Sequence, residues 1–112
     1  MEGTRLQKVA RLIQKDLGDI FQREGAALFP GKMITITSVR VSPDLALAKV
    51  YISIFPTKGT DETLEQIRHQ VKTLRLELGK RVRHQLRVIP ELAFFIDDSL
   101  DYIENIDRLL NQ

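Results

Sequence analysis

The sequence predicts an α+β fold in which helices cover one face of a three-stranded sheet. Apolar residues recur at helical spacing in some segments and alternate at strand spacing in others. The predicted order is α-β-β-α-α-β, with a short C-terminal helix after the last strand. With 112 residues, 43% of them hydrophobic and 29% charged, the chain is expected to form one domain, residues 1–112, around a single core.

The sequence of the N-terminal half predicts a helix followed by a β-hairpin. Thr4 and Gln7 have the spacing of a capping box, and a helical apolar stripe continues to about Gly25 through Leu6, Val9, Ala10, Ile13, Leu17, Ile20 and Phe21. Residues 33–41 are rich in β-branched side chains and predict a strand. The apolar positions change parity near Ser38, which indicates a bulge. A turn at 42–44 and an alternating segment at 46–54 complete an antiparallel hairpin.

The C-terminal half predicts two helices, a third strand and a helical extension. Thr60, followed by two acids, starts a helical region whose apolar stripe is Leu64, Ile67, Val71, Leu74, Leu78 and Val82. Leu76 falls among the basic residues and would be exposed on a straight helix, so we expect a bend within 70–79. Residues 92–96 predict the third strand. Asp98 or Ser99 is expected to cap a helix in the extension 97–112.

Positive charge is concentrated in residues 68–87, which hold seven Lys or Arg residues and one acid, Glu77. Residues 91–112 hold six acids and one Arg, so the molecule is electrically polarised although its net charge is only +2. Few acids lie four positions away to neutralise the cations, and phosphate binding would relieve their repulsion. We therefore predict RNA binding by Lys72, Arg75, Lys80, Arg81, Arg83 and Arg87, extended by Lys8, Arg11 and Lys15 on the first helix.

Two simpler interpretations stand beside this prediction. A charge run on a helix is, on general grounds, about as often a solvated face as a binding site. Tyr51 is the best candidate for stacking on a base, but it is about equally well explained as an ordinary tyrosine on the outward face of a strand, with no role in binding.

Residue types suited to catalysis or metal binding are few in this chain. It has no cysteine and no Gly-rich phosphate loop. His69 and His84 lie in the basic stretch without a carboxylate cluster at ligand spacing, so we expect no metal, no cofactor and no enzyme. Asp97 and Asp98 suit a strand end and a helix cap better than a catalytic pair. No apolar run has the length of a transmembrane helix and the N-terminus lacks a signal-peptide core, so we expect a cytoplasmic protein.

Several linked motifs resemble known RNA-binding proteins. A bent, basic helix pair on a three-stranded sheet resembles the type II KH domain, in which the junction of two helices clamps a nucleic-acid backbone. The strings TSVRVSPDL (37–45) and AKVYIS (48–53) are similar to the hairpin of the ribosome-binding factor A family. LRLELGKRV (74–82) and LRVIPEL (86–92), followed by Phe94 and DDSL (97–100), continue the resemblance in the same order.

The resemblance implies a factor for late maturation of the small (30S) ribosomal subunit, which binds 16S rRNA and assists its processing and folding without catalysis. It implies no cofactor, a greater need in the cold, and release assisted by other factors, including a GTPase. We expect a monomer. Two departures from the family pattern fall in the basic region: Gln70-Val71-Lys72 replaces an Ala-x-Gly at the bend, and His84-Gln85 is a two-residue insertion. A protein-interaction adaptor and a general nucleic-acid-binding domain are the alternatives.

Overall fold

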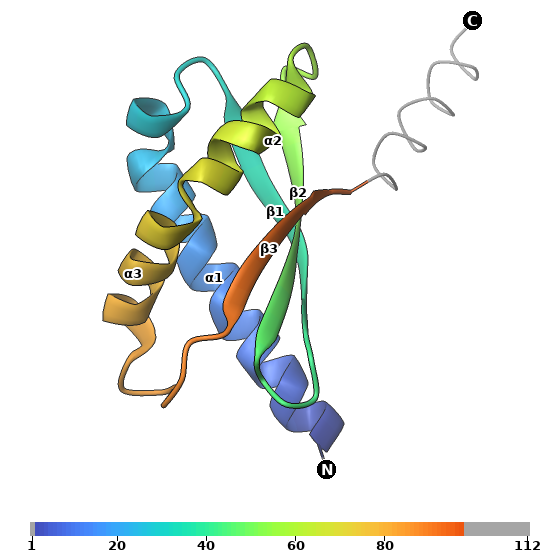
Figure 1. The fold of residues 1–112 in the computed structure, drawn as a ribbon, viewed down its shortest axis with the longest axis vertical. Helices are drawn as coiled ribbons and strands as arrows, with labels where there is room; N and C mark the ends of the chain where they lie inside the picture. The colour runs from blue at the N-terminus through green and yellow to red at the C-terminus, as the bar shows by residue number, and fades with distance from the viewer. Residues whose placement is uncertain (1, 98–112) are drawn as a thin grey trace, which may run out of the picture.

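The computed structural model describes residues 2–97, which form three helices and three strands. These are α1 (Glu2–Leu28), β1 (Met33–Val41), β2 (Leu47–Phe55), α2 (Thr60–His69), α3 (Val71–Val82) and β3 (Glu91–Ile96). All three helices lie on the same side of the sheet (Figure 1). The predicted α+β architecture and its order, α-β-β-α-α-β, are therefore confirmed. The C-terminal helix predicted in 97–112 lies outside the described residues.

The sheet is mixed and has the order β1-β2-β3. β1 and β2 form the predicted antiparallel hairpin, whereas β3 pairs with β2 in parallel. The predicted bulge is also present: Ile36 pairs with Ile52 and Ser38 with Tyr51, so Thr37 is skipped. Because of this extra residue, side chains on both sides of the bulge reach the core despite their change of parity.

The core lies between the sheet and the helices, and the predicted apolar stripes supply it. The buried side chains are Val9, Ile13, Leu17, Ile20 and Phe21 of α1, Phe29 directly after α1, Ile36 and Val39 of β1, Ala48, Val50, Ile52 and Ile54 of β2, Leu64 and Ile67 of α2, Leu74, Leu78 and Val82 of α3, and Leu92 and Phe94 of β3. Phe21 meets Phe94 edge-on, with ring centroids 6.1 Å apart, which joins α1 to β3 through the middle of the core.

Two helix starts differ from the sequence prediction. α1 begins at Glu2, so Thr4 lies inside the helix and the predicted capping box is wrong. α2 begins at Thr60 as predicted, but the residue that caps it is Gly59, whose φ of 76° is in the left-handed region that glycine adopts readily. The buried Thr63 hydroxyl donates to the Gly59 carbonyl at 3.1 Å and fixes this turn.

Candidate nucleic-acid interface

The helical region 60–82 is interrupted at a single residue, Gln70, between α2 and α3. Gln70 has φ −99° and ψ 8°, a conformation open to any residue, so the chain turns here without a glycine. Its amide donates to the Ile67 carbonyl and its carbonyl accepts from the Leu74 amide, both at 2.9 Å. The bend predicted within 70–79 is confirmed at its first position, and it places Lys72, which is exposed, in the first turn of α3.

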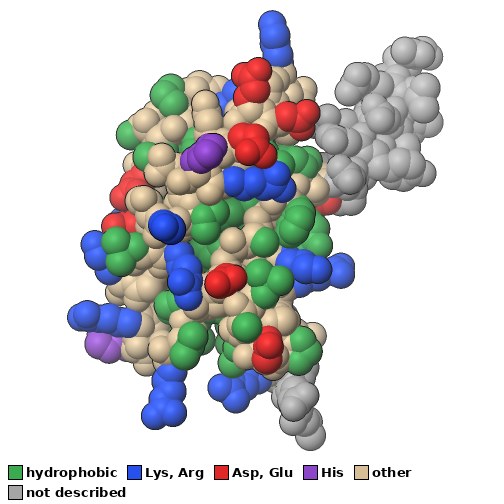
Figure 2. All heavy atoms as spheres, in the orientation of Figure 1, with side chains coloured by type: hydrophobic (Ala, Val, Ile, Leu, Met, Phe, Trp, Pro, Cys, Tyr) green, Lys and Arg blue, Asp and Glu red, His purple; other side chains and the backbone are tan. Residues whose placement is uncertain are grey.

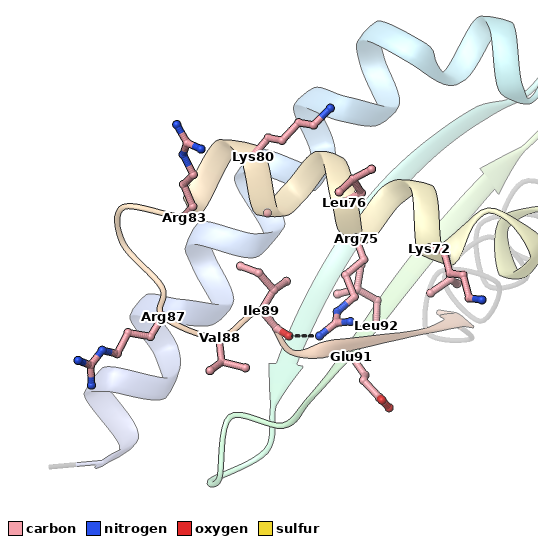
Figure 3. Close-up of a pocket in the computed structure, with 12 residues that line it drawn as sticks. Lys72, Arg75, Leu76, Lys80, Arg83, Arg87, Val88, Ile89, Glu91 and Leu92 are labelled. Carbon is pink, nitrogen blue, oxygen red and sulfur yellow. Dashed lines mark hydrogen bonds between the residues drawn. The ribbon is translucent and has the colours of Figure 1, made fainter.

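A groove of about 960 Å³ runs between α3 and the segment that leads into β3. Its lining residues are Val71, Lys72, Arg75, Leu76, Gly79, Lys80, Arg83, Arg87, Val88, Ile89, Glu91 and Leu92. Gly79 brings the helix close to the opposite wall, because a Cβ there would lie 3.5 Å from Cγ1 of Ile89. The groove therefore has one helical wall and one wall of loop and strand (Figure 3).

Arg75 ties the two walls together. Its Nε donates to the Pro90 carbonyl at 3.1 Å and its Nη2 donates to the Ile89 carbonyl at 2.5 Å. Figure 3 shows this side chain crossing from α3 to the segment before β3. Arg75 was predicted as a phosphate ligand, and in the structure its guanidinium donates to two backbone carbonyls of the opposite wall.

Two apolar side chains remain open to solvent in the groove. Leu76 is 61% exposed and Val88 is 68% exposed. The predicted bend is present at Gln70, but it does not bury Leu76. The reason given for the bend, that it would remove Leu76 from solvent, was therefore wrong. An exposed leucine and valine facing one groove provide apolar surface for a ligand.

The rim of this groove is cationic. Five of its lining residues are Lys or Arg and one, Glu91, is acidic. Lys80 Nζ lies 3.4 Å from Glu77 Oε1, whereas the side chains of Lys72, Arg83 and Arg87 make no hydrogen bond or ion pair within the described part of the chain. Arg83 and Arg87 extend outward in Figure 3, and Figure 2 shows Lys and Arg side chains gathered over α3 and the loop after it. Such charges are available to phosphates.

Arg81 points away from the groove and binds α1. Its Nε lies 3.1 Å from Asp16 Oδ1 and its Nη2 lies 2.9 Å from Asp19 Oδ2. The two carboxylates are one helical turn apart, so one guanidinium bridges both. The structure thus separates Arg81 from the other candidate cations and places it in the contact between α1 and α3.

The α1 cations reach the groove only in part. A second cavity of about 530 Å³ brings Arg5 and Lys8 of α1 next to Arg87 and Val88, which also line the groove. Arg11 and Lys15 are exposed further along α1 and line neither cavity. The cationic surface therefore continues from the groove to the start of α1 through Arg87.

The described residues show no constellation suited to metal catalysis. His69 and His84 are exposed, and residues 2–97 contain no group of three or more His, Asp or Glu side chains that could hold a metal ion. No helix in this range is long and apolar enough to cross a membrane.

Comparison with known proteins assigns the family. The sequence model of ribosome-binding factor A matches residues 5–110. The chain belongs to the ribosome-binding factor A family. A family member from Cytophaga hutchinsonii is 46% identical over 100% of this chain and 84% of its own length. One from Flavobacterium johnsoniae is 48% identical over 98% of this chain and 85% of its own.

Solved structures agree with the fold. The crystal structure of Thermus thermophilus ribosome-binding factor A has a TM-score of 0.67 and 23% identity, over 81% of this chain and 94% of that one. A homology model of the Thermus thermophilus factor, fitted into a cryo-electron-microscopy map of a 30S complex, has a TM-score of 0.60 and 27% identity, over 78% of this chain and 89% of that one.

Some residues of the candidate groove and of the cavity beside it were not among the residues predicted from the sequence. The apolar surface of Leu76, Val88 and Ile89 was missed, as was Arg5 beside Lys8. The signal for Leu76 was present, since an apolar residue among cations on a helix has no place in the core. For Val88 and Ile89 no such signal exists, because a loop has no periodicity from which exposure can be read.

Proposed function

We propose that this chain assists late maturation of the small ribosomal subunit by binding 16S rRNA in the groove between α3 and residues 87–92, without catalysis. The observation that carries the proposal is the pairing, in one groove, of exposed apolar side chains with a rim of available cations. Family membership supports it, and a Thermus thermophilus relative has been fitted into the density of a complex with the 30S subunit.

The groove suits unpaired RNA better than a duplex. Leu76 and Val88 offer apolar contact to the faces of unstacked bases, while Lys72, Lys80, Arg83 and Arg87 lie along the rim where the phosphates of the same strand would pass. The cations position the strand but do not read its sequence. Specificity then comes from which rRNA segment can present unpaired bases.

Binding of this kind remodels RNA through equilibrium. A factor that binds one conformation of rRNA shifts the population toward it by the difference in affinity between conformations. No cofactor is needed for this effect. From the family resemblance we also propose a cytoplasmic monomer whose release from the subunit is assisted by a maturation GTPase.

Co-sedimentation with purified small subunits tests the proposal. Wild-type protein is expected to migrate with free 30S particles in a sucrose gradient at moderate salt. Arg83→Gln with Arg87→Gln is expected to weaken binding about tenfold or more, since two phosphate contacts are lost. The matched control is Arg23→Gln with Lys58→Gln, which removes two exposed cations outside the groove. Equal binding by both double variants would show that the groove is not the site, and an affinity that does not change with salt would indicate a protein-interaction adaptor instead.

A further inference from the structure

The face of the sheet opposite the helices carries an aromatic and cationic cluster that the groove does not use. Among residues 2–97 no helix or loop covers this face (Figure 1). Tyr51 of β2 and Phe95 of β3 are register partners, and their ring centroids lie 5.7 Å apart with an angle of 32° between the rings. The guanidinium of Arg40, from β1, lies 6.0 Å from the centroid of the Tyr51 ring. Each of the three strands thus contributes one side chain to a single row.

The bulge in β1 shapes the space around Tyr51. Because Thr37 is skipped, the small Ser38 stands opposite Tyr51. One cavity of about 300 Å³ is lined by Ser38, Arg40, Tyr51 and Asp97. A second, of about 320 Å³, is lined by Arg40, Val41, Ser42, Pro43, Leu47, Lys49 and Tyr51. The tyrosine ring therefore has open space on two sides and a cation, Arg40, bordering both spaces.

Two cations on this face, Arg40 and Lys49, are available to an anionic ligand. Arg40 and Lys49 are exposed, and neither side chain makes a hydrogen bond or ion pair within the described residues. The neighbouring carboxylate of Asp97 accepts a hydrogen bond from the Thr37 hydroxyl at 2.5 Å. The aromatic surface is not fully covered either, since Phe95 is 37% exposed. Two available cations beside a tilted pair of aromatic rings are complementary to a base and its flanking phosphates.

We propose that Arg40, Lys49, Tyr51 and Phe95, here called the sheet platform, bind an unpaired RNA nucleotide. Its base stacks on the Tyr51–Phe95 pair, and Arg40 and Lys49 contact the phosphates on either side. The platform faces away from the helices, so it is a second RNA contact in addition to the groove. The identity of the ligand as RNA rests on the proposed function, but the position of the contact is independent of the groove.

Two contacts on different sides of one small domain have a functional consequence. A strand in the groove and a nucleotide on the platform belong to rRNA segments that need not be adjacent in sequence. The protein then fixes the distance between the two segments, and the second segment binds at a raised effective concentration once the first is bound.

Tyrosine fluorescence offers a direct test, because the chain has no tryptophan and only two tyrosines, Tyr51 and Tyr102. In the 112-residue chain carrying Tyr102→Phe, the emission reports Tyr51 alone. A single-stranded oligouridylate of about 12 nucleotides, long enough to occupy a typical single-strand site, is expected to quench this emission to saturation. Duplex RNA of the same length is expected to leave it unchanged, because its bases are not available for stacking. Emission is corrected for absorption by the RNA.

Affinity is measured separately by anisotropy of labelled oligouridylate. Loss of a stacking ring weakens binding about 5- to 140-fold, so Tyr51→Leu and Phe95→Leu are each expected to weaken it at least about fivefold. Tyr51→Phe keeps a stacking ring and is expected to bind as the wild type does. Phe55→Leu is the matched control, an exposed phenylalanine on the same strand and face outside the platform. Thermal unfolding verifies that each variant is folded.

The outcomes separate the platform from the groove. If both sites bind RNA, the variant carrying Arg83→Gln and Arg87→Gln binds oligouridylate more weakly, but saturating oligouridylate still quenches the emission of Tyr51. If the oligonucleotide binds without quenching Tyr51, or if Tyr51→Leu and Phe95→Leu bind like Phe55→Leu, the platform is overturned while the groove stands. The platform is also overturned, and the groove stands, if no RNA binds the platform while co-sedimentation with 30S particles depends on Arg83 and Arg87. Wild-type protein that binds neither RNA nor 30S particles overturns both proposals.

Discussion

Arg81 is expected to contribute more to folding than to RNA binding, although its position in the basic stretch suggests the opposite. Its side chain is 27% exposed, and it bridges Asp16, which is 15% exposed, and Asp19, which is 41% exposed. The Asp19 pair is well solvated and contributes about 0.2–1 kcal/mol. The Asp16 contact is mostly buried, and a hydrogen bond between charged groups in such a setting contributes about 1.5–3 kcal/mol. Arg81→Met should therefore lower the free energy of unfolding by about 2–3 kcal/mol.

Thermal unfolding followed by circular dichroism measures this loss. A chain of this size has an unfolding entropy near 0.2 kcal/mol/K, so the midpoint should fall by about 10–15 °C. Lys80→Met is the matched control, since the adjacent residue also forms an ion pair, but an exposed one with Glu77 that contributes under about 0.5 kcal/mol. Asp16→Asn combined with Arg81→Met should give a coupling energy of about 1 kcal/mol or more. A midpoint for Arg81→Met within about 2 °C of the Lys80→Met value would refute the reasoning.

Three further predictions concern stability. Leu78→Ala should lower the free energy of unfolding by about 2–5 kcal/mol in urea titrations, because Leu78 is buried. Leu76→Ala, two positions away and exposed, should change it by less than about 0.5 kcal/mol. Similar losses in the two variants would contradict the assignment of helix faces. Gly18→Ala should raise stability by about 0.5–1 kcal/mol because its Cβ meets nothing within 4 Å inside α1, while Gly59→Ala should lower it because φ is +76°. Hydrogen bonds from the Ser42 hydroxyl and then the Ala46 amide hold the pKa of Asp44 below its ordinary value of 3.8. The carboxylate therefore stabilises the fold at neutral pH. The difference in stability between wild type and Asp44→Ala should shrink as the pH falls through that lowered pKa, and a difference that grows as the pH falls would contradict this sign.

The parts of the fold that follow a regular period could be predicted from the sequence. β-Branched alternation fixes the strands at 33–41 and 46–54 to within a residue of their observed bounds, and the parity change near Ser38 reports the bulge. The stripe along 64–82 likewise identifies the buried face of α2 and α3. These features depend on residues near one another in the chain, where spacing directly determines which side chains share a face.

The partners of long side chains could not be predicted in the same way. Arg81 and Asp16 are 65 positions apart, and only the packing of α3 on α1 brings them together. Arg75 binds carbonyls of a loop whose path no pattern determines. The parallel pairing of β3 with β2 also depends on the helices between them. A count of cations along the sequence therefore does not tell which of them have protein partners, as Arg75 and Arg81 do.

That difference has a measurable consequence for RNA binding. If all six candidate cations of residues 72–87 contacted phosphates, the logarithm of the affinity for single-stranded RNA would fall with the logarithm of salt concentration with a slope of about −4. The structure leaves four on the groove rim, Lys72, Lys80, Arg83 and Arg87, which gives a slope of about −3 in the absence of other contacts. Anisotropy titrations between low and moderate salt distinguish the two, and Tyr51→Leu can serve as the background that removes the platform. A slope near −4 in that background would mean that Arg75 and Arg81 exchange their protein partners for phosphate on binding. Arg81→Met would then reduce the slope by about one, whereas a purely structural Arg81 leaves it unchanged.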